Sequence, residues 1–152
     1  MEIERKFLTK EIPFSLEQYH CCRISQAYIS VSPTIRIRQS NEKYFLTVKS
    51  KGEMARKEFE IEITQQEYAA LEKKCETPAV YKTRYFIPLS QNLTAEVDVY
   101  EGHLEGLITT EVEFDTQESA KQFLPPKWFG EDVTFDNRYK NTNLSLYGIP
   151  KA

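Results

Sequence analysis

The chain has 152 residues, with 40% hydrophobic residues, 28% charged residues and a formal net charge of −3. This length matches one domain, and we predict a single domain over residues 1–152. The negative net charge argues against duplex nucleic acid as a partner. No apolar run approaches the roughly 20 residues that span a bilayer. Because the N-terminus leads directly into charged residues, we expect a cytoplasmic protein without membrane association.

The N-terminal residues alternate in polarity, which predicts a first strand over residues 2–9. Glu2, Glu4 and Lys6 would share one face of this strand, whereas Ile3 and Phe7 would lie on the other. Two carboxylates and an ammonium on one face can hold a divalent cation and an anion together. The same run is also compatible with an ordinary solvated strand face, so the rest of the chain has to decide.

Similar alternation recurs along the chain and predicts seven further strands, two pairs of which form hairpins. The turns of these hairpins would be Ser40–Glu42 and Gly102–Gly106. Helices are predicted at residues 15–20, at 65–75 after a capping box of Thr64 and Glu67, and at 116–124. This pattern favours a mainly β (α+β) fold, a closed eight-stranded antiparallel β-barrel with a few helices packed outside. The further strands are expected at residues 23–31, 34–39, 43–51, 56–63, 80–88, 94–101 and 107–114.

The charges of these strands are sorted by sign, strand by strand. Any one such face is compatible with a solvated outer surface. Both predicted hairpins, however, join strands of the same sign, and like charges directly opposite each other destabilise an antiparallel pair. A polyanion on the basic hairpin and a divalent cation on the acidic one would relieve this repulsion. The basic faces carry Arg36 and Arg38, Lys49 and Lys51, and Lys82 and Arg84, and the acidic faces carry Glu58, Glu60 and Glu62, Glu96 and Asp98, and Glu111 and Glu113.

The residue types narrow the kind of ligand. Carboxylates without a nearby His or Cys cluster favour Mg²⁺ or Mn²⁺, and the three cysteines (Cys21, Cys22 and Cys75) lack metal-ligand spacing and are expected to pack as ordinary side chains. With the charged faces turned inward, the barrel would be a charged tunnel whose apolar outer faces the helices must cover. These outer faces would present Ile3, Phe7, Ile35, Ile37, Phe59, Ile61, Val97, Val99, Val112 and Phe114.

The charged motifs, taken in chain order, resemble the CYTH family, also called triphosphate tunnel metalloenzymes. The resemblance implies an eight-stranded antiparallel tunnel that uses Mg²⁺ or Mn²⁺ on a small-molecule triphosphate substrate. It extends over nearly the whole chain, and the combination is specific although each motif alone is weak. The motifs are Glu2-x-Glu4-x-Lys6, Arg36-x-Arg38, the Lys49 strand, Glu58-x-Glu60-x-Glu62, Lys82-x-Arg84, Glu96-x-Asp98 and Glu111-x-Glu113.

The same resemblance implies roles for individual residues. Lys6, Tyr28 and Glu60 would take part in catalysis, with a water near the Glu60 strand attacking the terminal phosphorus. Tyr28 would support Lys6, although a half-buried strand aromatic explains it equally well. The metal ligands would be Glu2, Glu4, Asp98, Glu111 and Glu113. The triphosphate would be bound by Lys6, Arg36, Arg38, Lys49, Lys82 and Arg84.

The segment 137–141 and the choice of substrate stay open at this stage. This segment either lays a short helix across one tunnel mouth, which brings Arg138 to the phosphate, or forms a surface turn. We expect hydrolysis of inorganic triphosphate to pyrophosphate and phosphate, with weaker activity on nucleoside triphosphates. The alternatives are a class IV-type adenylyl cyclase and a non-catalytic polyphosphate-binding module. The sequence leaves open whether the protein is a monomer or a homodimer.

Overall fold

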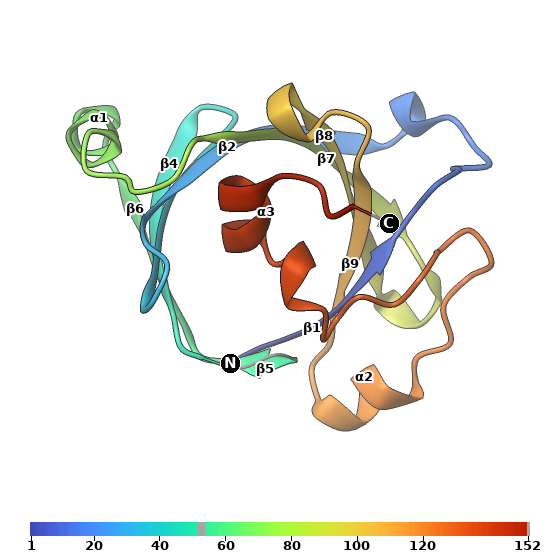
Figure 1. Cartoon of the computed structure of the whole chain (residues 1–152). Helices are drawn as coiled ribbons and strands as arrows, with labels where there is room; N and C mark the ends of the chain where they lie inside the picture. Colours follow the sequence, from blue (N-terminus) through green and yellow to red (C-terminus); the bar gives the residue numbers. More distant parts are fainter. Residues whose placement is uncertain (52–53, 152) are drawn as a thin grey trace.

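The strands of the chain pair into one antiparallel sheet that curls into a nearly closed barrel (Figure 1). The computed structural model describes residues 1–51 and 54–151. The order of the strands in the sheet is β5-β1-β9-β8-β7-β2-β3-β4-β6. Their bounds are β1 (Glu2–Leu8), β2 (His20–Ser30), β3 (Thr34–Ser40), β4 (Lys43–Lys49), β5 (Ala55–Arg56), β6 (Glu58–Ile63), β7 (Val80–Pro88), β8 (Thr94–Glu101) and β9 (Ile108–Glu113).

The barrel closes because its two edge strands, β5 and β6, are consecutive in the chain with only Lys57 between them. Strand β5 pairs with the start of β1, where Arg56 lies opposite Glu2. The predicted β-barrel is therefore confirmed, with a ninth short strand because the stretch expected at residues 56–63 divides at Lys57. Asn41 has a positive φ of 54° in the tight turn between β3 and β4, as the predicted hairpin requires.

The remaining edge of β1 is covered by the segment that follows α2. The backbone N–H of Leu8 donates to the carbonyl of Glu131 at 2.8 Å, and that of Gly130 donates to the carbonyl of Leu8 at 2.6 Å. A side chain at position 130 would place its Cβ 2.4 Å from the Leu8 carbonyl oxygen, so only glycine allows this approach. Both halves of the β1 edge are thus paired with backbone.

Short helices connect and cover the strands. The capping box of Thr64 and Glu67 begins α1 as predicted, and Thr116 caps α2. The helix expected at residues 15–20 is only the 3₁₀ turn η1, and α3 was not predicted beyond Asn141. No helix among residues 1–51 and 54–151 is long and apolar enough to cross a membrane. The bounds are α1 (Gln65–Glu72), α2 (Gln117–Gln122), α3 (Asn141–Tyr147), η1 (Leu16–Gln18), η2 (Ser90–Asn92), η3 (Gly102–Leu104) and η4 (Asn137–Tyr139).

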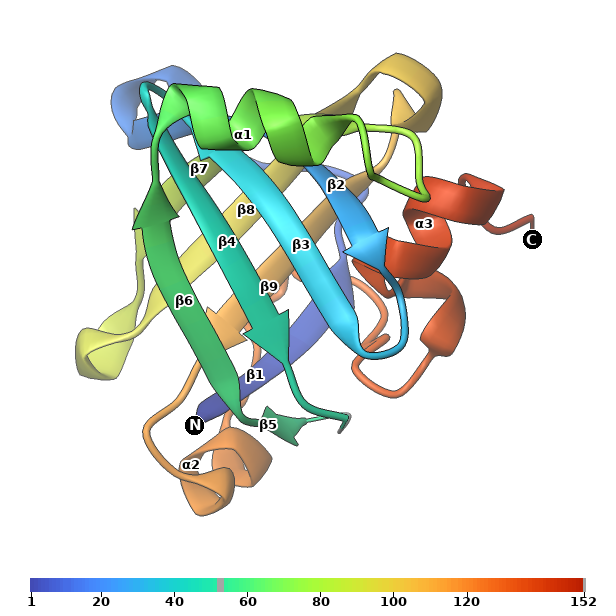
Figure 2. The same cartoon turned by 90° about the vertical axis from the view of Figure 1, so that its left-hand side faces the viewer.

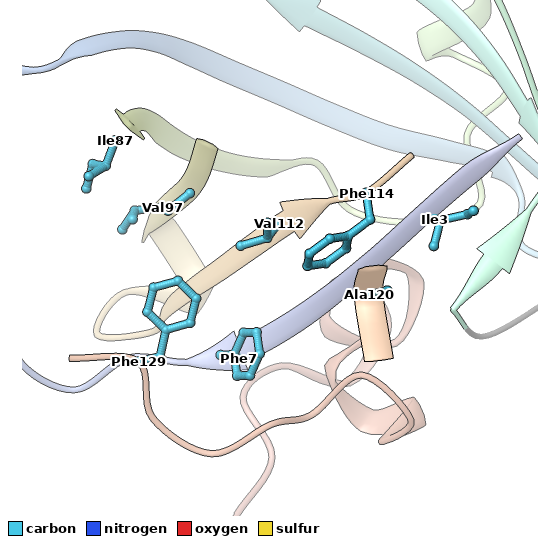
Figure 3. Close-up of a cluster of buried hydrophobic side chains, with 9 residues drawn as sticks. Ile3, Phe7, Ile87, Val97, Val112, Phe114, Ala120 and Phe129 are labelled. Carbon is cyan, nitrogen blue, oxygen red and sulfur yellow. The ribbon is translucent and has the colours of Figure 1, made fainter. Parts of the chain in front are cut away.

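The main apolar core lies outside the barrel, between β1, β8 and β9 and the segment from α2 to Phe129 (Figure 3). Phe7 contacts Phe129 with ring centroids 4.9 Å apart. Arg5, on the same face of β1, donates from Nη1 to the carbonyls of Ala120 and Phe123 at 3.0 and 2.9 Å and so holds the end of α2. The outward apolar side chains of β1, β8 and β9 are therefore covered, as the alternation predicts.

The outer face of β6 differs from this expectation. Phe59 is 60% exposed and Ile61 is 42% exposed, so the prediction that helices cover every apolar outer face is wrong here. The reason is the path of α1, which leaves the end of β6 and crosses the start of β4, away from Phe59 and Ile61 (Figure 2). There its Tyr68 packs on Tyr44, with ring centroids 5.0 Å apart.

A second, smaller core holds α3 against one mouth of the barrel (Figures 1 and 2). Leu144 is fully buried against Val80, Tyr100 and Leu104. The hydroxyl of Tyr100 donates to Asn141 at 3.1 Å. The segment from η4 to α3 therefore lies across this mouth, so the first of the two readings of residues 137–141 describes the backbone correctly.

Candidate active site

The inward faces of the strands enclose a cavity of about 550 Å³ lined almost entirely by charged and polar side chains. Each of the nine strands contributes to its walls, and the start of α3 lies at one mouth. The residues of β1, β3 and β6 that line the cavity are all even-numbered, as strand alternation requires. The lining includes Glu2, Glu4, Lys6, Tyr28, Arg36, Arg38, Lys49, Arg56, Glu58, Glu60, Arg84, Glu96, Glu111 and Glu113.

The basic wall on β3 carries two arginines whose hydrogen-bond partners are neutral. Arg36 is only 4% exposed, and its Nη2 donates to the Thr47 hydroxyl at 3.3 Å. Its buried Nε has no hydrogen-bond partner among the described residues. Arg38 donates from Nε to the Gln26 side-chain oxygen at 2.9 Å. Burial, and then repulsion by Arg36 and Arg84, lowers the pKa of Arg38 to about 10.

The register of this hairpin corrects one prediction. Arg36 lies opposite Thr47, Arg38 opposite Phe45, and Lys49 opposite Thr34. Like charges are therefore not directly opposite each other in the basic hairpin. In the acidic hairpin one pair of like charges is directly opposite, as predicted, because Glu96 lies opposite Glu111.

The basic residues of β7 have a different environment, because both bind the carboxylate of Asp98. Lys82 Nζ lies 2.8 Å from Asp98 Oδ2, and neither side chain is exposed. Arg84 donates from Nε to Oδ1 at 2.7 Å and from Nη2 to Oδ2 at 2.9 Å. Burial raises the pKa of Asp98, but Arg84 and Lys82 outweigh it and hold that pKa below its usual value. Asp98 is thus a counter-ion of β7, a role that sequence reasoning did not assign.

Three carboxylates meet on the acidic side of the cavity. Glu2, Glu4 and Glu113 each offer an oxygen, and these oxygens lie within 4.8 Å of one another. Such an all-oxygen donor set fits a hard divalent cation such as Mg²⁺ or Mn²⁺. Glu2 also accepts from Lys49 Nζ at 3.1 Å. Burial raises the pKa of Glu2. The charge of Lys49, a hydrogen bond with Glu58 and the charge of Arg56 together lower it by more, so the net shift is downward.

Glu4, a member of this cluster, and the neighbouring Glu111 have pKa values that are shifted in opposite directions. Burial, followed by the charges of Glu111 and Glu2, raises the pKa of Glu4 to about 8. Burial also disfavours ionised Glu111, but Lys6, Arg84 and Lys82 outweigh it and hold its pKa well below the usual range. The two pKa values are therefore shifted in opposite directions, so a proton bound by this pair resides on Glu4 and not on Glu111.

A family model of the CYTH domain matches residues 1–143. The chain belongs to the CYTH family. A curated relative from Nitrosomonas europaea, an inorganic triphosphatase, is 42% identical over 149 residues, which cover 95% of this chain and 97% of the relative. An inorganic triphosphatase from Acetivibrio thermocellus is 36% identical over 146 residues, which cover 94% and 92% of the two chains. The crystal structure of an inorganic triphosphatase matches with a TM-score of 0.72 at 40% identity, and the match covers 99% of this chain and 97% of that chain.

Within this CYTH fold, the three residues expected to act in catalysis all line the cavity. The Lys6 ammonium donates to the Tyr139 carbonyl at 2.6 Å and lies 3.8 Å from Glu111. Burial raises the pKa of the Tyr28 hydroxyl, which therefore keeps its proton at neutral pH. Glu60 accepts from the Thr47 hydroxyl at 2.8 Å and lies 3.8 Å from Arg36.

Other expected site residues lie elsewhere. Arg138 is exposed and pairs with Asp136 at 2.7 Å, and neither Arg138 nor Lys82 is among the described residues that line the CYTH cavity. Conversely, Arg56 lines the cavity and was not predicted as a site residue. Its only signal in the sequence is its even number, which places it on the same face as Glu58 and Glu60.

The acidic side adjoins a second cavity at the end of the CYTH tunnel opposite α3. This space of about 710 Å³ is lined by Met1, Asn92 and Asp115, among others. Its walls share Glu2, Glu58, Glu60, Glu96 and Glu113 with the first cavity. The N-terminus and the η2 turn lie at this end, and α3 lies at the other (Figure 2).

Proposed function

We propose that the protein is a divalent-metal-dependent hydrolase that converts inorganic triphosphate to pyrophosphate and phosphate, with weaker activity on nucleoside triphosphates. Both curated relatives named above are inorganic triphosphatases and match almost the full chain. The name that these relatives share supports inorganic triphosphate as the substrate. The charged cavity supports metal-dependent hydrolysis of a phosphate anhydride.

One observation carries the choice of an inorganic substrate over a nucleotide. Among the described residues that line the first cavity, the only apolar or aromatic side chains are Tyr28, Val31, Val133 and Tyr139. A nucleobase needs an apolar or aromatic surface to replace its contacts with water. A chain of phosphates needs cations instead, and eight lysine and arginine side chains line this cavity.

The anion would lie between the basic and the acidic sides of the tunnel. Arg36 and Arg38 offer guanidinium groups that no carboxylate neutralises at hydrogen-bond distance, and Arg groups suit bidentate contacts to phosphate. Lys6, Lys49 and Arg84 add positive charge around the same space. Lys82 would contribute indirectly, because it fixes Asp98 and with it the position of Arg84.

Glu2, Glu4 and Glu113 would hold the divalent cation, and Glu111 would support them through Lys6 and Glu4. When bound, Mg²⁺ or Mn²⁺ would neutralise phosphate oxygens and make the terminal phosphorus easier to attack.

Glu60 is the residue that we assign to the attacking water. Its Oε1 accepts from Thr47, which fixes the carboxylate and leaves Oε2 free to accept a proton of the water. Tyr28 keeps its proton because burial raises its pKa, and it would donate a hydrogen bond to a phosphate oxygen. Lys6 would stabilise the negative charge that develops on the leaving pyrophosphate.

The test is an assay of the metal-stripped protein with inorganic triphosphate or ATP, with and without added Mg²⁺ or Mn²⁺. We expect pyrophosphate and phosphate from inorganic triphosphate, ADP as the main product of slower ATP turnover, and no turnover under chelation. Cyclic AMP with pyrophosphate as the main products of ATP would replace the hydrolase by the cyclase. Binding of inorganic triphosphate without any product would indicate a binding module.

A further inference from the structure

Arg56 forms the bridge between two carboxylates of the acidic cluster. Its Nη2 lies 3.1 Å from Glu2 Oε1 and 2.9 Å from Glu4 Oε1. One guanidinium nitrogen therefore occupies the position between the two acids. Its side chain is 18% exposed, and its Nε is buried with no hydrogen-bond partner among the described residues.

The other charges around the cluster do not replace this bridge. Lys49 contacts Glu2, at 3.1 and 3.3 Å from the two carboxylate oxygens. The ion pair of Glu4 among the described residues is the one with Arg56. Because Glu2 and Glu4 are two of the three acids that approach within 4.8 Å, the guanidinium is in the place where a cation would sit.

We propose that Arg56 is an internal counter-cation that positions Glu2 and Glu4 in the metal-free protein and competes with the divalent metal for them. A Mg²⁺ ion bound to the Oε1 atoms of both acids would lie about 2.0–2.1 Å from each of them. It would then be in close contact with the same Nη2, and two cations repel strongly in a site with little water. Metal binding through these two Oε1 atoms therefore requires the guanidinium to leave the pair. This inference rests on the metal site of the proposed function.

The position of Arg56 in the chain permits such a movement. Arg56 belongs to a two-residue strand, β5, which pairs with β1 only at Glu2 and Ile3. The adjacent Lys57 interrupts the sheet between β5 and β6. A guanidinium on so short a strand can change its partner without breaking a long ladder of backbone hydrogen bonds.

The competition is tested by titrating the metal-stripped protein with Mn²⁺ by calorimetry, without any phosphate compound. We expect Arg56→Gln to bind Mn²⁺ at least 10-fold more tightly than wild type. The matched control is Arg38→Gln, which removes the same charge from the same cavity. In wild type, Arg38 donates to Gln26 and not to a carboxylate. The affinity of this control variant should change less than 3-fold. Equal tightening in both variants, or weaker binding by Arg56→Gln, would overturn the proposal.

Thermal unfolding provides a second measurement. Without metal, Arg56→Gln should melt below wild type, because Glu2 and Glu4 lose their bridge, and saturating Mn²⁺ should raise its melting temperature by more than it raises that of wild type. Arg56→Lys, which keeps the charge but cannot bridge both acids, serves if Arg56→Gln does not fold, and it should bind Mn²⁺ about 3-fold more tightly than wild type. No tightening in Arg56→Lys would also overturn the proposal.

The outcomes separate this inference from the function proposed above. Tighter Mn²⁺ binding by Arg56→Gln together with no hydrolysis of inorganic triphosphate by wild type would uphold the inference and refute the hydrolase. Hydrolysis by wild type with no tightening in Arg56→Gln would do the reverse. If neither wild type nor Arg56→Gln bound Mn²⁺, the metal site and the inference would both be refuted.

Discussion

Strands β3 and β7 carry the same basic-x-basic pattern into the tunnel, but their neighbours give the two pairs different properties. Arg36 and Arg38 on β3 donate to the neutral side chains of Thr47 and Gln26. Lys82 and Arg84 on β7 both bind the buried carboxylate of Asp98 on the adjacent strand. The first pair has one acid nearby, Glu60 at 3.8 Å from Arg36, and keeps most of its charge for a ligand. Most of the charge of the second pair is already neutralised.

This difference shows that a motif on one strand does not settle the role of its residues. A buried cation with a neutral partner is costly unless a ligand of opposite sign arrives. A buried cation with a well-placed carboxylate is stable in the free protein and mainly holds geometry. We therefore regard β3 as the anion-binding wall and β7 as the wall that keeps Arg84 in position.

The largest effect should come from removing the counter-ion of β7. Asp98→Asn would leave Lys82 buried without its carboxylate partner and Arg84 with Glu96 at 3.5 Å in place of two short hydrogen bonds to Asp98. Breaking a buried ion pair on one side lowers stability by about 3–5 kcal/mol. Urea unfolding of the metal-free protein measures this loss. The control is Asp115→Asn, an exposed acid, which should change stability by less than about 0.5 kcal/mol. Equal stability of both variants would mean that Asp98 does not hold the β7 wall together.

The next largest effect concerns catalysis and the β3 wall. Arg36→Ala and Arg38→Ala should each remove a charge-assisted contact to phosphate and cost about 2–4 kcal/mol of transition-state stabilisation, or roughly 10²–10³-fold in kcat/KM. Arg23→Ala is the control, because Arg23 has a side chain that is 73% exposed and contacts Glu101 outside the cavity. Near-wild-type turnover of inorganic triphosphate by both single variants would exclude β3 as the anion-binding wall.

Most of the fold could be predicted from the sequence because strand alternation is a local property. Eight of the nine strands, the two hairpins and the caps at Thr64 and Thr116 follow from polarity, turn residues and caps. The exceptions depend on tertiary contacts. Helix α3 contains two asparagines, which are weak helix formers, and it is held by the burial of Leu144 against the barrel. The exposed face of β6 reflects the path of α1, which no local pattern records.

The site was predictable as a set of residues but not as a set of pairs. Alternation places Glu2, Glu4 and Arg36 in the tunnel, and the cavity contains all three. The partner of each charge depends on strand order and register, which place Asp98 opposite Arg84 and Arg56 opposite Glu2. A single arginine before an acidic strand has no distinguishing signal in the sequence, so the bridge made by Arg56 was missed.

A pH experiment tests whether Arg84, which is already paired with Asp98, also neutralises the carboxylate of Glu96. Arg84 Nη1 lies 3.5 Å from Glu96, yet burial, opposed by Arg84 and reinforced by Glu111 and Glu113, raises the pKa of Glu96 to about 7. A pKa that is higher in the folded state contributes stability below the unfolded value of 4.5, and this contribution is lost as the pH rises through about 7.

Glu96→Gln should therefore match wild type in stability at pH 4, below the unfolded pKa of 4.5, and exceed it by about 3 kcal/mol at pH 8 in the metal-free protein. Urea unfolding at both pH values, in the presence of a chelator, provides the comparison. An advantage of Glu96→Gln that does not change with pH would show that Arg84 neutralises Glu96 after all, and that the β7 wall has charge to spare for a ligand.

The smallest effect should be on the stability of the β3 wall, and its sign carries the information. Arg38 is a buried cation whose pKa is lowered to about 10 by burial and by repulsion from Arg36 and Arg84. Arg38→Gln loses one hydrogen bond to Gln26, worth about 1 kcal/mol, but it also removes this repulsion. The stability of the protein without substrate should stay unchanged or rise by up to about 1 kcal/mol, whereas Arg84→Gln, which deprives Asp98 of a partner, should lower it. Thermal unfolding of both variants in chelator measures the contrast. A stability loss of more than about 1 kcal/mol in Arg38→Gln would mean that β3, like β7, is neutralised within the folded chain, and the distinction between an anion-binding wall and a supporting wall would disappear.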